Sequence, residues 1–171
     1  PARIPDPAVS ARVINKCLDV GINFIDTSNN YGQGQSEVHI GEALKGRRDE
    51  AIIATKFNLN KLEDESIPAR INRCVDESTG KLQTDHIDLY QIHWPVHGLP
   101  HEEVLGPLND LVKAGKFRYI GECNYSSGRH AMSDSTAGRT GLPKMVSTQN
   151  YYNLFRRQIE LELLPFATEN N

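Results

Sequence analysis

The stretch Ala51-Ile52-Ile53-Ala54-Thr55-Lys56 decides the fold. Its nearly unbroken apolar run has the length of one β-strand and is typical of a strand that a parallel sheet buries on both faces. Similar runs cover residues 22–26 and 87–93, and they end at Asp26 and His93. Helix-like segments separate the three runs, so the sequence predicts strand–helix–strand units and a parallel sheet.

Outside these strands the sequence continues the same alternation. Asp6 followed by Pro7 marks the start of a first helix, whose apolar stripe consists of Val9, Val13, Cys17 and Val20. The helix expected at residues 126–141 is rich in Ser, Thr and Gly, so its propensity is poor and only the alternation predicts it. Apolar spacing and end signals place the other helices at residues 36–45, 66–82, 100–114 and 155–164, and two more strands at residues 117–122 and 144–149.

The alternation has no compositional break, which predicts a single α/β domain over residues 1–171. Five strands cannot close an eight-stranded barrel, and such a barrel typically needs about 250 residues. Two architectures therefore stay open, a doubly wound open sheet and part of a (β/α)8 barrel. The polar residues at the strand ends favour the barrel.

Composition limits the class of protein. Of 171 residues, 38% are hydrophobic and 24% are charged, as in a globular domain. The formal net charge is −3 without a long basic run, which argues against nucleic acid as a partner. No apolar stretch approaches the length of a membrane-spanning helix or the core of a signal peptide. Three widely spaced cysteines fit neither a disulfide scaffold nor a zinc site, so a cytoplasmic protein without a metal is expected.

Four polar residues stand where predicted strands end or in the loop that follows: Asp26, Tyr31, Lys56 and His93. In a parallel α/β fold the carboxyl ends of all strands lie at one rim, so these side chains should meet there. Taken singly, most of them fit an ordinary structural role, but Lys56 at the end of an apolar strand needs a partner. Asp88 lies in mid-strand and is expected to bond the backbone or a neighbouring helix. The sequence therefore predicts a proton-transfer site at the rim.

Such a set of groups suits carbonyl reduction, in which the carbon accepts a hydride and the oxygen accepts a proton. An ordinary phenol, with a pKa of about 10, is too weak an acid for efficient transfer. A neighbouring ammonium lowers that value, and a carboxylate behind the ammonium keeps it in place. Tyr31, Lys56 and Asp26 supply these groups, and His93 can hydrogen-bond the substrate oxygen and stabilise its negative charge. None of them transfers hydride, so a cofactor is required.

Blocks of sequence around these residues carry a specific resemblance. The first blocks are Gly21-Ile22-Asn23-Phe24-Ile25-Asp26-Thr27-Ser28 with Tyr31-Gly32, Ile53-Ala54-Thr55-Lys56, and Asp88-Leu89-Tyr90-Gln91-Ile92-His93-Trp94-Pro95. The later blocks are Gly115-Lys116-Phe117-Arg118-Tyr119-Ile120-Gly121 with Asn124, and Gln149-Asn150-Tyr151-Tyr152-Asn153-Leu154. In this order, and over nearly the whole chain, they resemble the aldo-keto reductase family.

The resemblance implies a (β/α)8 barrel that reduces aldehydes and ketones, its small-molecule substrates, with NADPH. The positions of the family's catalytic residues match Asp26, Tyr31, Lys56 and His93. Tyr31 would then be the general acid. The positions that contact the nicotinamide carboxamide match Cys123, Asn124 and Gln149. Trp94 matches an apolar wall of the substrate pocket.

The chain departs from the family pattern in two respects. The family usually has Ser at the position of Cys123, and a thiol is a poorer hydrogen-bond donor, so contact with the carboxamide should be weaker. The first strand, the amino-terminal hairpin and the last two strand–helix units of the barrel are not represented, which leaves about five strands and six helices. Two other interpretations stay open: a weakly active or inactive regulatory relative similar to potassium channel β subunits, and a truncated fragment without function.

Overall fold

The computed structural model describes residues 6–60, 62, 65–95 and 98–170. Its strands are β1 (Phe24–Asp26), β2 (Ile52–Phe57), β3 (Ile87–Ile92), β4 (Phe117–Cys123) and β5 (Thr148–Gln149). Its α-helices are α1 (Pro7–Asp19), α2 (Gln35–Ala43), α3 (Ile67–Leu82), α4 (His101–Lys113), α5 (Ser127–Thr140) and α6 (Leu163–Asn170). Short 3-10 helices are η1 (Tyr31–Gly34), η2 (Arg48–Glu50) and η3 (Gln158–Glu160). None of the helices in these described ranges is long and apolar enough to cross a membrane.

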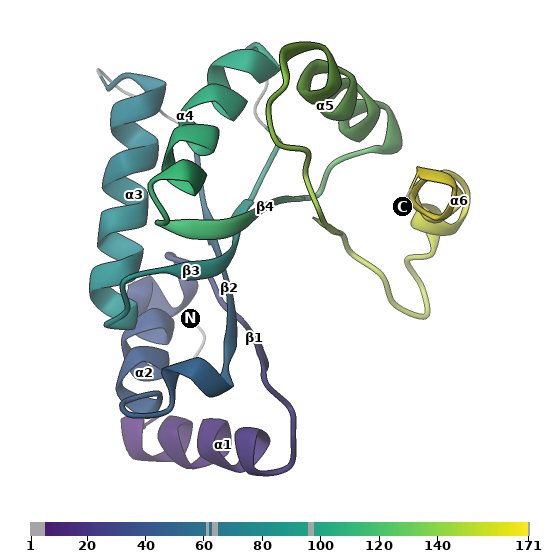
Figure 1. Cartoon of the computed structure of the whole chain (residues 1–171). Coiled ribbons are helices and arrows are strands. Elements are labelled where there is room, and N and C mark those ends of the chain that lie inside the picture. The colour runs from purple at the N-terminus through teal and green to yellow at the C-terminus, as the bar shows by residue number, and fades with distance from the viewer. Residues whose placement is uncertain (1–5, 61, 63–64, 96–97, 171) are drawn as a thin grey trace.

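All neighbouring strands are parallel, and they lie in the sequential order β1-β2-β3-β4-β5. A doubly wound sheet reverses its strand order at a switch point, and this sheet does not. Figure 1 shows the sheet curling into an arc, with α1 to α5 along its outer side and its inner side open. The predicted fold class, part of a (β/α)8 barrel, is therefore confirmed, and the doubly wound alternative is excluded.

The core lies between the sheet and the outer helices. Four residues of α3 that lie on one side of the helix, Ile71, Val75, Ser78 and Leu82, are all buried. Tyr90 of β3 lies at the centre of this layer, with its ring stacked 4.5 Å from that of Phe57. The helix with poor propensity, α5, forms because Ser126 caps its first turn and left-handed Gly141 ends it.

Most of the apolar stripe of α1 does not pack against the core. Val9, Val13 and Val20 are exposed, whereas Leu18 is buried and Ile14 packs against the core. This helix contacts α2 more than it contacts the sheet, because β1 offers only three residues of strand beside it. The apolar stripe therefore marked a helix but not its buried side.

Two elements near the carboxyl end also differ from the prediction. The fifth strand contains only Thr148–Gln149 rather than residues 144–149, although Val146 still donates a backbone hydrogen bond to Ile120 of β4. The last helix begins at Leu163 rather than at residue 155, and it includes Pro165 in its first turn. A proline is tolerated there because first-turn N–H groups have no partner within the helix.

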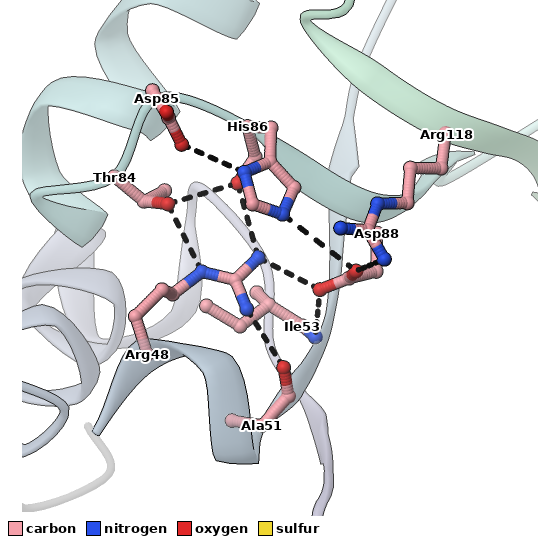
Figure 2. A network of polar contacts seen from close by, with 8 residues as sticks. All are labelled: Arg48, Ala51, Ile53, Thr84, Asp85, His86, Asp88 and Arg118. Atoms are coloured by element: carbon pink, nitrogen blue, oxygen red, sulfur yellow. Dashed lines mark hydrogen bonds and ion pairs between the residues drawn. The ribbon is translucent and has the colours of Figure 1, made fainter.

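A polar network joins β2 to β3 around Asp88 (Figure 2). Its Oδ2 accepts hydrogen bonds from the Ile53 N–H at 2.9 Å and from Arg48 Nη2 at 2.7 Å, and Arg118 lies 3.3 Å from Oδ1. Burial alone would raise the pKa of Asp88, but the Ile53 amide and the Arg48 guanidinium outweigh it and lower that pKa. The structural role predicted for Asp88 is confirmed.

We expect Asp88→Asn to lower the free energy of unfolding by about 3 kcal/mol at pH 7, because Arg48 loses its buried carboxylate. Denaturant titration of the complete protein measures this loss. Because the folded-state pKa of Asp88 is lowered, its stabilisation is present above the unfolded value of about 3.9 and is lost as the pH falls through the folded-state pKa. The difference between variant and wild type should therefore shrink in strong acid.

Asp76→Asn is the matched control, since Asp76 forms an exposed ion pair with Lys116 at 3.1 Å. Loss of such a pair costs less than about 1 kcal/mol. Equal losses in the two variants, or a difference for Asp88→Asn that does not shrink in acid, would contradict the role given to the network.

Candidate active site

The pleat of the sheet directs the predicted site residues to its inner side. Thr55 donates a hydrogen bond to Glu37 of α2 at 2.7 Å and so points toward the outer helices. Successive side chains of a strand alternate, so Lys56 points inward. Lys56 pairs with Gln91 of β3, and His93 follows Gln91 by two residues. His93 therefore lies on the same side, one layer nearer the carboxyl rim.

The ammonium of Lys56 is the centre of the cluster, and Lys56 is only 1% exposed. Its Nζ donates to Asp26 Oδ2 and to the Thr27 carbonyl, both at 2.7 Å, and reaches Tyr31 Oη at 3.5 Å. All three ammonium hydrogens thus have acceptors, as burial of the charge requires. The structure brings the predicted carboxylate, ammonium and phenol together.

Three left-handed residues follow Tyr31 in the loop after β1. Gly32, Gln33 and Gly34 have φ values of 56°, 59° and 88°. Glycine adopts such values without strain. A tight turn before Tyr31 lets its N–H donate to the Ser28 carbonyl at 3.1 Å. Tyr31 is 41% exposed, and its ring centre lies 4.9 Å from the Lys56 ammonium.

His93 is nearly buried beside the phenol. Its ring meets the Tyr31 ring edge to face at 5.8 Å and stacks on Trp94 at 5.7 Å, and its Nδ1 lies 3.2 Å from Ser28 Oγ. Burial lowers the pKa of His93, and the Lys56 ammonium lowers it further. The imidazole is therefore neutral at pH 7.

Cys123, Asn124 and Gln149 form a polar group at the ends of β4 and β5. Burial raises the pKa of Cys123 to about 12, so its thiol stays protonated, and its Sγ donates to Gln149 Oε1 at 3.6 Å. Asn124 has a left-handed φ of 62°, and its Nδ2 donates to the His93 carbonyl at 3.0 Å. Each of the two amides is therefore oriented by the protein.

A cavity of about 300 Å³ opens between these groups, a size at the lower end of small-molecule sites. Its walls include the predicted residues Tyr31, His93, Trp94, Cys123, Asn124 and Gln149. Asp26 and Lys56 support Tyr31 from behind. Sequence reasoning missed three further wall residues, Asn150, Tyr151 and Tyr152. Their signal was their position directly after Gln149 at a strand end. All eight predicted residues lie at one rim, and their individual roles stay predictions.

The fold is part of a (β/α)8 barrel with a cluster of polar side chains at its rim. The chain belongs to the aldo/keto reductase family, whose model matches residues 3–171. The membership of this family, which the sequence blocks indicated, is confirmed.

Individual relatives support this assignment. The chain is 42% identical to aldo-keto reductase YhdN of Bacillus subtilis, over 96% of this chain and 50% of that protein. It is 33% identical to the putative aryl-alcohol dehydrogenase AAD16 of Saccharomyces cerevisiae, over 98% of this chain and 56% of that protein. A crystal structure of an aldo/keto reductase from Klebsiella pneumoniae, in complex with NADP and acetate, matches 95% of this chain and 55% of that chain, with a TM-score of 0.84 and 27% identity. The chain therefore spans about half the length of these relatives.

We expect Cys123 to resist alkylation by iodoacetamide in the folded protein at pH 8. A thiol with a pKa of about 12 has roughly a thousandfold less thiolate than a free cysteine, and Cys123 is also buried. Cys17, which is partly exposed, should react first, and buried Cys74 should resist as Cys123 does. Peptide mass spectrometry over a time course measures the three rates. Cys17→Ser is the control and should remove the fast reaction, whereas labelling of Cys123 as fast as that of Cys17 would contradict the geometry.

Proposed function

We propose that this protein reduces aldehyde or ketone carbonyls to alcohols with NADPH, and that Tyr31 is the general acid. The observation that carries the proposal is the buried ammonium of Lys56 between the Asp26 carboxylate and the Tyr31 hydroxyl. A cation in this place favours the phenolate that forms when the hydroxyl gives up its hydrogen. A lysine with a purely structural role requires a carboxylate to offset its buried charge, but it does not require a phenol that faces a cavity.

The hydrogen bonds of Asn124 and Gln149 fit a nicotinamide carboxamide, which has one acceptor and one donor group. Asn124 uses its Nδ2 on the His93 carbonyl, which leaves its Oδ1 to accept. Gln149 uses its Oε1 on the Cys123 thiol, which leaves its Nε2 to donate. The two free groups complement the carboxamide, and NADP is present in the Klebsiella relative. Bound NADPH supplies the hydride.

The other residues of the site orient the substrate and exclude water. Tyr31 Oη gives its hydrogen to the carbonyl oxygen, while Lys56 stays protonated and Asp26 keeps it in place. The neutral ring of His93 borders the same oxygen. Trp94, stacked on that ring, supplies an apolar wall of the pocket, which limits the access of water to the reacting carbon.

The proposal is tested by adding NADPH and benzaldehyde to the complete protein and following the loss of cofactor absorbance. Tyr31→Phe should lower kcat about 100-fold to 10,000-fold, the usual contribution of a general acid, and should leave NADPH binding nearly unchanged. Tyr90→Phe is the matched control, because it removes the same hydroxyl from a tyrosine on the outer side of the sheet that does not line the cavity.

Turnover by Tyr31→Phe at the wild-type rate would remove Tyr31 from the role of acid. Tight binding of NADPH by a folded wild-type protein that turns over no carbonyl would contradict the enzymatic proposal and favour a regulatory relative. Equal losses in both tyrosine variants would point to an effect on folding rather than on proton transfer.

A further inference from the structure

We infer that Glu122 and His130 are positioning residues of the site. Their nearly buried ion pair closes the turn between β4 and α5, and so holds the two site residues of that turn, Cys123 and Asn124, at the rim. Neither Glu122 nor His130 had a predicted role, and neither lines the cavity. The inference rests on the proposed function for the ligand concerned, NADPH. The contacts that support it lie on the outer side of the sheet and do not depend on that function.

Glu122 carries a carboxylate into the layer between the sheet and the outer helices. It is 0% exposed, and it points outward because the next residue of β4, Cys123, faces the cavity. Its Oε1 is paired with Nδ1 of His130, whose side chain is 13% exposed. Its Oε2 is buried and has no hydrogen-bond partner among the described residues. A buried carboxylate requires a partner, so the pair with His130 is what makes Glu122 tolerable at this position.

The pair spans the turn that carries Asn124. Asn124 has a left-handed φ of 62°, which is uncommon outside glycine, and its N–H donates to the Gln149 carbonyl at 2.9 Å. Glu122 is attached to the neighbouring segment, since its N–H donates to the Ser147 carbonyl at 3.0 Å. His130 lies in the first turn of α5. The pair therefore ties a residue two positions before Asn124 to one six positions after it.

Other charged groups border the pair without replacing it. Asp134 of α5 lies 3.9 Å from His130 Nε2, and Lys144, in the segment before β5, lies 3.6 Å from Asp134. Arg129, also of α5, adds a smaller attraction to Glu122. On the side of α6, the ring of Phe166 meets the His130 ring edge to face at 5.6 Å. The nearby carboxylates of α4 and α6, Glu102 and Glu162, are bonded to Arg139 and Ser127 of α5.

The pair should weaken in alkaline solution. The hydrogen bond to Glu122 raises the pKa of His130, and burial raises the pKa of Glu122. Both shifts mean that the folded protein binds protons more tightly than the unfolded chain does. The stabilisation from His130 is therefore complete below its unfolded value of about 6.5 and is lost as the pH rises through its folded-state pKa. Above that pH the buried carboxylate has no counter-charge, and the turn should open more often.

The test follows the Asn124 amide by NMR hydrogen exchange in the complete protein, because its bond to Gln149 must break before exchange. The protection factor corrects for the intrinsic pH dependence of exchange. The histidine signals are titrated in the same samples, and His130→Gln identifies those of His130 by their loss. We expect His130 to titrate at a higher pH in the wild type than in Glu122→Gln. The protection of Asn124 should fall at least about fivefold as the pH rises through the pKa of His130.

Three variants separate the charge from the shape of the pair. Glu122→Gln still accepts a hydrogen bond from a neutral imidazole, so the protection of Asn124 should no longer depend on pH. His130→Gln leaves the carboxylate without a counter-charge at any pH, so at pH 7 it should show the low protection that the wild type reaches in alkaline solution. His86→Gln is the matched control, because His86 also bonds a carboxylate, Asp85 at 2.7 Å, but before β3 begins. Its Asn124 protection should follow that of the wild type.

Wild-type protection of Asn124 that does not change with pH, or that changes equally in Glu122→Gln, would overturn the inference. This measurement needs no cofactor, so the expected exchange in a protein that does not bind NADPH would contradict only the proposed function. In a protein that binds NADPH, the Kd should rise at least about fivefold over the same pH range in the wild type and stay constant in Glu122→Gln. NADPH should also raise the pKa of His130, since such coupling is reciprocal. The same pH dependence of Kd in both proteins would contradict the link between the turn and the cofactor.

Discussion

The buried ammonium of Lys56 is the interaction on which the rest of the site depends. Removal of an ammonium from water costs several kcal/mol, which is offset only when its hydrogens all find acceptors. Two of these acceptors, Asp26 Oδ2 and the Thr27 carbonyl, come from the end of β1. A slip of β1 against β2 by one residue would turn Asp26 to the other face and leave the charge unpaired. The register of β1 against β2 that brings Asp26 to Lys56 is therefore also the register that the buried charge requires.

A second buried polar contact supports the site from the outer side of the sheet. Burial raises the pKa of Glu37, which accepts a hydrogen bond from Thr55 at 2.7 Å. This bond attaches α2 to β2 at the residue before Lys56, and α2 begins directly after the turn that carries Tyr31. A side chain at Gly41 would come within 2.6 Å of the Leu82 backbone, so glycine lets α2 lie close to α3. The Tyr31 loop is thus fixed from both sides of the sheet.

The sequence predicted the strands and the rim because a parallel sheet imposes local rules. An apolar run that ends in a single lysine, Lys56, already indicates both the strand and the rim at which the strand ends. The apolar stripe of α1 identified a helix, but its buried side depends on which neighbour packs there. Pro165 follows directly on the helix predicted at residues 155–164, and it lies instead in the first turn of α6, which accepts a proline. The contact between Ser28 and His93 joins residues 65 positions apart, and no local pattern signals such a pair.

The two faces of the sheet differ in how far this chain completes them. On the outer side of the sheet, Ile53, Phe57 and Tyr90 are 0% exposed. On the inner side, Phe24, Ile52 and Tyr119 are 54%, 41% and 57% exposed. An eight-stranded barrel fills its interior with layers of side chains from all its strands, and five strands supply only part of each layer. The site lies at the rim, where the end of β1 and the loop after it supply three partners of the Lys56 ammonium. The geometry of this cluster is therefore a local property of β1, β2 and the loop between them, whereas the inner layer depends on how many strands surround it.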